Sequence, residues 1–222
     1  MPMITHLLQK TKYHTAGLAA AALMMTTATC GAQTTIVDNL SNTHSAQLYA
    51  SPGQPLLAQE FTTGSLGYDL GNVVISAFDA GGGTNAPLGV AIWTGNATQP
   101  GSLDATLTGT NPTGTTPADY TFSPTGTVAL AANTPYWIVL NYTGTAGSYG
   151  WVYSLDTSST GPGTMGGIAF NNGSWTYSAS ANFLSQVNSA AVPEPGMYTA
   201  IFGAGMLAVA GWRSSVRKNR RA

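Results

Sequence analysis

The sequence predicts an all-β body that folds as an antiparallel two-sheet sandwich of jelly-roll type. Short runs of β-branched and aromatic residues recur from residue 33 to about residue 190, and such runs are typical of strands. Segments rich in glycine and proline separate them, which favours turns because glycine permits positive φ and proline fixes φ at about −65°. No part of this region shows sustained helical periodicity. Many short strands with turns between them indicate a sandwich.

The apolar runs define the expected strands. In chain order they are 35–40, 59–63, 71–78, 89–94, 105–107, 119–122, 127–130, 136–142, 150–153, 167–170, 175–178 and 183–187. Turn-rich segments such as Asp79–Pro87 and Thr157–Gly163 connect them. No internal repeat of useful length is present, which argues against a propeller or a solenoid.

Two of the expected strands are apolar on both faces. In 136–140, alternation puts Tyr136, Ile138 and Leu140 on one face, and Trp137 and Val139 on the other. Strands of this kind lie centrally in a sheet that is covered on both sides. The same alternation in 88–93 separates Leu88, Val90 and Ile92 from Ala91 and Trp93.

Residues 1–32 are predicted to be a secretory signal peptide, followed by the body at 33–187. Lys10 and Lys12 form its positive region, Ala16–Met25 is a short apolar segment, and small residues up to Ala32 predict cleavage before Gln33. An alternative is a lipoprotein cysteine at Cys30, although no leucine precedes it at the expected position. Cleavage after Ala32 removes the single cysteine, so the body is expected to contain no disulfide.

The C-terminal end has three parts: a linker at 188–196, an apolar helix at 197–212 and a basic tail at 213–222. Sixteen helical residues span about 24 Å, somewhat less than a hydrocarbon core of about 30 Å. The cations next to the helix are expected to stay on the cytoplasmic side. The linker contains Val192, Pro193, Glu194 and Pro195, and the tail carries Arg213, Arg217, Lys218, Arg220 and Arg221.

This order of proline–glutamate–proline, apolar helix and arginine cluster resembles the PEP-CTERM sorting tails of Gram-negative bacteria. The resemblance implies that an exosortase in the inner membrane recognises the tail, and that the protein is anchored transiently before it reaches the cell surface or extracellular matrix. Processing is expected near Pro193–Pro195. An ordinary C-terminal membrane anchor is the alternative.

The body in turn resembles the choice-of-anchor extracellular domains, the R type in particular. That resemblance implies an extracellular domain with no assigned catalytic activity, and it brings no site residues with it. It is carried by motifs in a fixed order: Asp38-Asn39-Leu40, Ala58–Gly64, Val90–Trp93 with Pro100–Leu103, and Leu130–Leu140.

Charge is divided between the ends and the body. All seven Lys and Arg residues lie in the two terminal segments, and all eight acidic residues lie between them. A body without cations cannot neutralise phosphates, which excludes nucleic-acid binding. Repulsion between the negative charges of the body favours its solubility. The acidic residues are Asp38, Glu60, Asp69, Asp79, Asp104, Asp119, Asp156 and Glu194.

Residues for catalysis are scarce, and we expect a protein that is not an enzyme. A Ser-His-Asp triad would have to use His44, and no nucleophile-elbow sequence is present. A secreted glycosidase would need two carboxylates across a sugar cleft, and none of the acids lies in a recognisable motif. No cofactor is expected. Calcium is possible, since Asp69, Asp79, Asp104, Asp119 and Asp156 lie near loops, but solvated turn aspartates are the more ordinary interpretation.

Aromatic residues suggest an alternative function, which is binding to extracellular polysaccharide. Tryptophan and tyrosine faces stack on pyranose rings, although core packing is their commoner role. Trp151 and Trp175 lie near glycines and are the expected exposed pair, whereas Trp93 and Trp137 lie on apolar strands and are expected in the core.

Overall fold

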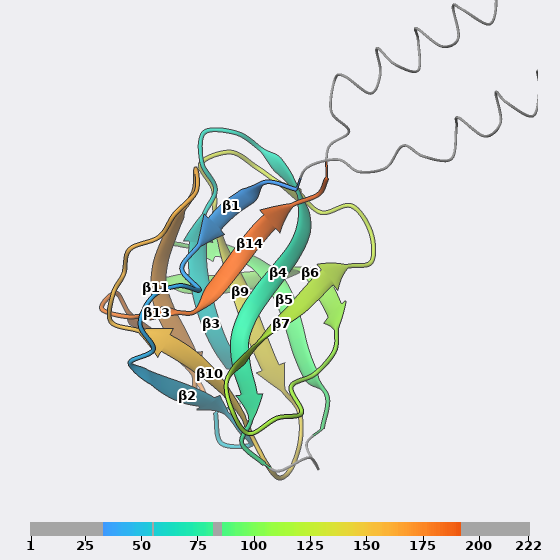
Figure 1. Cartoon of the computed structure of the whole chain (residues 1–222), viewed down its shortest axis with the longest axis vertical. Helices are drawn as coiled ribbons and strands as arrows, with labels where there is room; N and C mark the ends of the chain where they lie inside the picture. The colour runs from blue at the N-terminus through green and yellow to red at the C-terminus, as the bar shows by residue number, and fades with distance from the viewer. Residues whose placement is uncertain (1–32, 55, 82–85, 192–222) are drawn as a thin grey trace, which may run out of the picture. The chain divides into compact units, whose positions relative to one another are not determined.

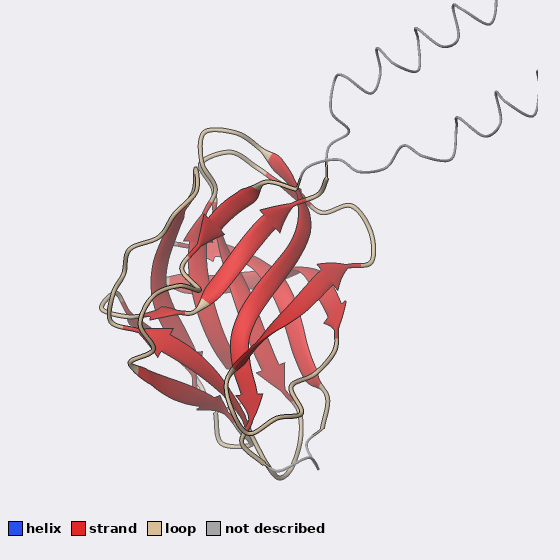
Figure 2. Cartoon of the chain, in the orientation of Figure 1, coloured by secondary structure: helices blue, strands red, loops and turns tan. Residues whose placement is uncertain are grey.

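A computed structural model describes residues 33–54, 56–81 and 86–191. The regular secondary structure in this part of the chain consists of β-strands (Figure 2). The all-β prediction is therefore confirmed. The strands are β1 (Thr35–Asp38), β2 (Ala46–Ala50), β3 (Leu56–Thr62), β4 (Tyr68–Asp79), β5 (Leu88–Asn96), β6 (Gln99–Gly109), β7 (Ala118–Pro124), β8 (Ala129–Leu130), β9 (Pro135–Tyr142), β10 (Tyr149–Ser154), β11 (Thr164–Asn171), β12 (Trp175–Ser178), β13 (Asn182–Phe183) and β14 (Ser185–Ser189).

The strands form one 14-stranded antiparallel sheet instead of the two separate sheets predicted. Its main path is β1-β14-β4-β7-β6-β5-β9-β3-β11-β12. The pairing of β6 with β7, in which Leu107 faces Pro124 and Gly109 faces Phe122, makes the sheet continuous. Twisted strands curl so large a sheet on itself, here into a half-barrel (Figure 1). The sandwich prediction was wrong because a curled sheet and a sandwich bury the same alternating positions.

Hydrogen bonds bridge the open side of the curl, between β1 and the segment that leads into β11. Asp38 N donates to Thr160 O at 2.9 Å, and Thr160 N donates back to Asp38 O at 2.8 Å. Gly163 N donates to Ile36 O at 2.9 Å. Gly161 between them has φ +106°, a conformation that favours glycine. The first strand thus ties the two halves of the sheet together.

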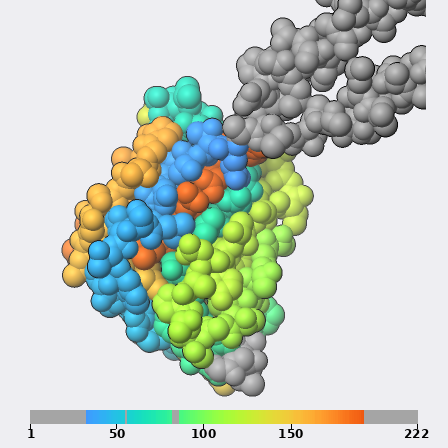
Figure 3. Space-filling view, viewed as in Figure 1, coloured from blue at the N-terminus to red at the C-terminus, as the bar shows by residue number. Residues whose placement is uncertain are grey.

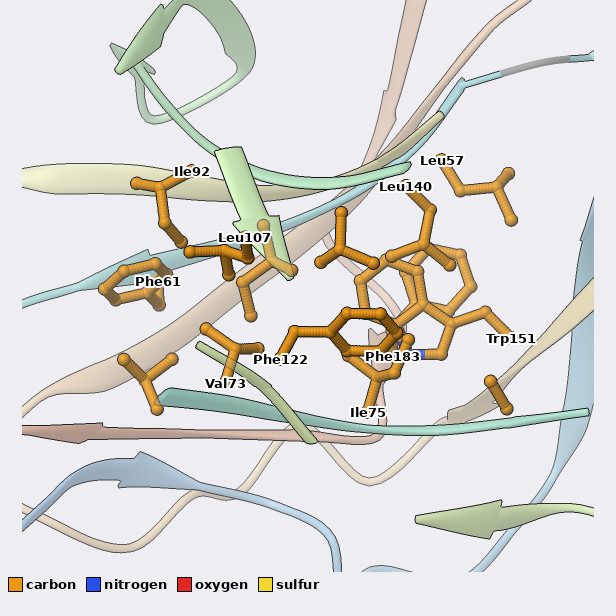
Figure 4. Packing of buried hydrophobic residues seen from close by; sticks show 14 of the residues in the cluster. Leu57, Phe61, Val73, Ile75, Ile92, Leu107, Phe122, Leu140, Trp151 and Phe183 are labelled. Carbon is orange, nitrogen blue, oxygen red and sulfur yellow. The ribbon is translucent and has the colours of Figure 1, made fainter. Parts of the chain in front are cut away.

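The main core fills the inside of the curl, where side chains from both halves of the sheet meet (Figure 4). Val73 and Ile75 of β4 lie on one side, and Ile138 and Leu140 of β9 on the other. Tyr136 joins them, which confirms the prediction that Tyr136, Ile138 and Leu140 share one face of the strand. Burial of each such aliphatic side chain contributes about 1.5–3 kcal/mol. The prediction that Leu88, Val90 and Ile92 share one face of β5 is also confirmed, since all three are buried in the same core.

One strand was not expected from the sequence, and one expected strand is divided. β2 was not expected, because Ala46–Ala50 contains no β-branched residue; it pairs with β10 through backbone contacts such as Tyr49 with Gly150. The expected strand 183–187 is divided at Leu184. The Leu184 N–H donates to Val152 O at 2.9 Å, and its side chain packs against Phe78 outside the main core.

The last strand, β14, lies between β1 and β4 (Figure 3). The sequence prediction assigned residues 188–196 to a linker. Its first two residues were assigned wrongly, since Asn188 and Ser189 belong to β14 and are buried in the sheet. The Asn188 Nδ2 donates to Asn72 Oδ1 at 2.8 Å, and Thr35 Oγ1 donates to Asn188 Oδ1 at 3.1 Å. Polar side chains that pair with each other look like a linker in sequence, and only the fold reveals their partners.

The expected signal peptide (1–32), the apolar helix (197–212) and the basic tail (213–222) lie outside the described residues, as do residues 192–196 of the expected linker. A search of the described part of the chain finds no helix with the length and apolar character needed to cross a membrane.

Candidate functional site

The outer surface of the sheet carries aromatic residues in a regular arrangement set by strand register. In one row, Glu60 of β3 faces Trp137 of β9, which faces Trp93 of β5. A second row, two residues further along the strands, crosses from β12 to β5 as Tyr177, Ala169, Ala58, Val139 and Ala91. A third row consists of Trp175, Asn171, Leu56, Asn141 and Gly89. We call Trp93, Trp137, Trp175 and Tyr177, with the small residues of the second row, the outer aromatic face.

Small residues in the second row let the aromatic side chains of the face lie over the sheet. Ala58, Val139 and Ala169 are fully buried, and they form one cluster with Trp137. Trp93, Trp175 and Tyr177 are only partly buried and pack against that cluster. Each of these three side chains therefore covers apolar surface on one side and keeps part of its own surface in solvent.

Trp137 is held in a fixed orientation at the centre of the face. Its Nε1 donates to Asn96 O at 2.9 Å, at the end of the β5–β6 hairpin. Gly95 permits this approach, because a Cβ there would lie 2.9 Å from Trp137 Nε1. The ring of Tyr177 meets Trp137 edge to face, with centroids 6.2 Å apart and planes at 79°. The hairpin and β12 thus hold the buried tryptophan from two directions.

A β-bulge in β11 makes room for two side chains of this face. The register with β3 shifts between Met165 and Ile168, at the pair Gly166–Gly167. A Cβ at Gly167 would lie 2.7 Å from Tyr177 Cζ, and a Cβ at Gly166 would collide with Glu60 Oε2. Both glycines are needed for close approach, which is a common use of glycine at bulges.

Glu60 is a buried carboxyl group beside these aromatic rings, only 5% exposed. Burial raises its pKa above the ordinary value, and hydrogen bonds from Thr62 and from the Gly167 backbone offset part of the effect. Thr62 Oγ1 donates to Glu60 Oε1 at 3.4 Å. Glu60 therefore holds its proton up to a higher pH than a solvated glutamate does.

The structure separates the two tryptophans that the sequence singled out. Trp175 is partly exposed on the outer aromatic face. Trp151 is fully buried on the inner face of β10, and its Nε1 donates to Leu184 O at 3.1 Å. The expectation that Trp151 is exposed was wrong because Gly150 belongs to the strand and not to a loop: it makes space for the ring of Phe78. A buried indole cannot bind a surface ligand.

Trp137 and Trp93, the other two tryptophans considered, also differ from each other in exposure. Trp137 is buried as expected, although it belongs to the outer cluster and not to the main core. Trp93, expected in the core, is partly exposed beside it. Trp93 and Trp137 are each adjacent in sequence to a core isoleucine, Ile92 or Ile138. Because neighbouring side chains on a strand point to opposite faces, this alternation was the sequence signal that could have placed both tryptophans on the outer face.

The aspartates considered for calcium are spread over the molecule. Within the described residues, no group of three or more His, Cys, Asp or Glu side chains could hold a metal ion. Asp79 Oδ1 accepts from Gly81 N at 2.7 Å, and Asp156 Oδ1 accepts from Ser158 N at 2.9 Å. Both are Asx-turn geometries, and the Ser158 backbone N–H and hydroxyl lower the pKa of Asp156. His44, which catalysis would require, is exposed beside Gln47 at 3.4 Å.

A shallow depression of about 530 Å³ lies where β14 ends. Gln33, Asp69, Thr125 and Ala190 contribute to its lining, and Asp69 is the one charged residue among the residues that line it. The Ala190 N–H donates to Asp69 O at 2.6 Å, so the chain is still attached to the sheet at this residue. The depression brings together no acid–base pair.

The segment that follows β14 resembles a known protein family. A search of curated proteins finds no match to the chain. Residues 191–218 match the PEP-CTERM protein-sorting motif. The match contains Val192, Pro193, Glu194 and Pro195, together with Arg213, Arg217 and Lys218, while Arg220 and Arg221 follow it. The motif implies export, interaction with an exosortase and membrane-associated sorting toward the cell surface.

Proposed function

We propose that the chain is an exported, non-enzymatic protein of the cell surface or extracellular matrix, which an exosortase sorts through its C-terminal tail. The observation that carries the proposal is the PEP-CTERM motif at residues 191–218, which begins two residues after the last residue of β14, Ser189. The signal-like residues 1–32 support the same route of export. Cleavage near Pro193–Pro195 would release the body or transfer it to another carrier.

Two features of the body support a structural role. Its acidic side chains are scattered, and many of its polar side chains serve to hold strands and turns together, as Asn188 and Asp156 do. The body also resembles choice-of-anchor extracellular domains in the order of its short sequence motifs. On this proposal the half-barrel is cargo, and its place in the cell is decided by the tail.

Intact mass of the protein recovered from the surface of an exosortase-containing host tests this proposal, because it reports both ends of the chain. We expect a species that begins at Gln33 and lacks Arg213–Ala222. Glu194→Ala should leave the full tail attached and the protein in the membrane fraction. Asp104→Asn, which removes an exposed acid from β6 of the body, is the matched control and should be processed normally. A surface form that retains Arg213–Ala222, or protein dissolved in the cytosol, would contradict the proposal.

A second candidate function is binding of extracellular polysaccharide. The observation that favours it is the partial exposure of Trp93, Trp175 and Tyr177 on one face of the sheet. Turnover of a polysaccharide, abolished by one carboxylate substitution, would instead indicate a hydrolase.

A further inference from the structure

We propose that the outer aromatic face binds an uncharged polysaccharide, with Trp93, Trp175 and Tyr177 as stacking surfaces for pyranose rings. The inference rests on the surface location in the proposed function, and it specifies the second candidate there: it names the site, the residues and the class of glycan.

The first argument is the shape and size of the face. Trp93 lies on β5 and Tyr177 on β12, and four steps between adjacent strands separate them in the order β5-β9-β3-β11-β12. At about 4.8 Å per step, the face is about 19 Å long, enough for several linked sugar rings. Aromatic side chains with one side against small residues and another in solvent can stack on the apolar faces of sugars without rearrangement of the sheet.

The second argument is the supply of hydrogen-bonding groups beside the aromatic rings. Asn141 and Asn171 belong to the same row as Trp175 and alternate with Leu56. Asn141 is exposed, and its side chain makes no hydrogen bond within the described part of the chain. Asn171 Oδ1 accepts from Gly173 N at 2.9 Å, while its amide N–H groups remain available in this part of the chain. Amides both donate and accept, which suits the hydroxyl groups of a sugar.

The third argument is charge, which decides the class of polysaccharide. The body contains no Lys or Arg, and Glu60 lies in one row with Trp137 and Trp93 on the same face of the sheet. An acidic polysaccharide would meet only repulsion from such a surface, with no cation to pair with its carboxylates or sulfates. An uncharged glycan meets no such penalty, because stacking and hydrogen bonds to amides do not need charge.

Trp137 and Gly167 are positioning residues in this site. The Trp137 indole is pinned to Asn96 O, and Tyr177 packs against it above Gly167. These contacts fix Tyr177 before a ligand arrives, which lowers the entropic cost of binding.

The test is affinity electrophoresis of the full chain in a polyoxyethylene detergent, which contains no sugar that could compete. The probes are a soluble β-glucan, a mannan and a galactan, with alginate as the acidic comparison. We expect binding to at least one neutral glycan and none to alginate. Trp93→Ala and Trp175→Ala should each weaken binding about tenfold, or about 1.4 kcal/mol. Asn141→Ala should weaken it without removing an aromatic ring.

Tyr49→Ala is the matched control, because Tyr49 is an exposed aromatic residue on β2, at 40% exposure, outside the face. It should bind as the wild type does, and thermal unfolding of each variant shows whether it is folded. No binding to any neutral glycan, binding to alginate alone, or binding as strong as the wild type's by the Trp93→Ala and Trp175→Ala variants would each overturn the proposal. A dimer that the same two substitutions dissociate would show that a second copy covers the face, and would overturn it too. None of these results would alter the processed mass that tests export.

Discussion

The indole of Trp151 stacks on the ring of Phe183, with centroids 4.2 Å apart and planes inclined by 7°. Trp151 belongs to β10 and Phe183 to β13, which pairs with β10. Tyr153 meets the same phenyl ring edge to face at 6.4 Å. This stack closes one end of the main core and anchors the short strand that leads into β14.

Trp151→Ala should destabilise the body by about 3–5 kcal/mol, because it removes a fully buried indole and leaves a cavity beside Phe183. It also leaves Leu184 O without its donor. Chemical denaturation measures the change. Trp175→Ala, which removes a partly exposed indole, is the comparison and should cost much less. Similar losses for the two would mean that their burial is not as described.

Glu60→Gln should change how stability depends on pH. Burial raises the folded-state pKa of Glu60 above its ordinary value of 4.5. The fold therefore favours the protonated group, so this contribution is complete below the unfolded-state pKa and is lost as pH rises through the folded-state value. The variant should be more stable than the wild type at alkaline pH and nearly equal to it below pH 4.5. Denaturation midpoints across this range measure the difference.

Asp156→Asn provides the control of opposite sign. Hydrogen bonds from Ser158 lower the pKa of Asp156 from 3.8, so its contribution is present above that value and is lost as pH falls. Asp156→Asn should therefore be less stable than the wild type above the acid range and about as stable as the wild type at low pH. A Glu60→Gln profile parallel to the wild type at every pH would contradict the assigned burial of Glu60.

Gly167→Ala should destabilise the protein by about 1–3 kcal/mol, because the added methyl group would press against Tyr177 and the Ser178 carbonyl. Gly126→Ala is matched to it, since nothing lies within 4 Å of a Cβ there. That substitution should be neutral or stabilise by up to about 1 kcal/mol. Thermal unfolding distinguishes them. Equal effects would argue against the close packing of Tyr177 on β11.

Asn188→Ala should cost about 1–3 kcal/mol, because the side chain is buried and its loss leaves Asn72 and Thr35 without a partner. Asn172→Ala, in the exposed β11–β12 turn, should change stability by less than about 0.5 kcal/mol. Urea denaturation tests the pair. If Asn188→Ala were as mild as Asn172→Ala, residue 188 would behave as a linker residue after all.

Local patterns predicted much of the body. Alternation in 136–140 correctly separated Tyr136, Ile138 and Leu140 from Trp137 and Val139, because the side chains of a strand point alternately to its two faces, but it did not show which face is the outer one. The same rule could not locate β2, whose Ala46–Ala50 lacks a strand-like composition. It also could not reveal that Asn188 is buried, because a polar residue is buried only when partners distant in sequence satisfy it.

The sequence by itself determined the sorting tail, the all-β class and the uneven distribution of charge, because each depends on residues close together along the chain or on composition. Only the tertiary structure decided that one sheet curls into a half-barrel and that Trp151 lies inside while Trp93, Trp175 and Tyr177 share an outer face. Those properties depend on which strands pair and in what register, and pairing is set by contacts between residues far apart in the sequence.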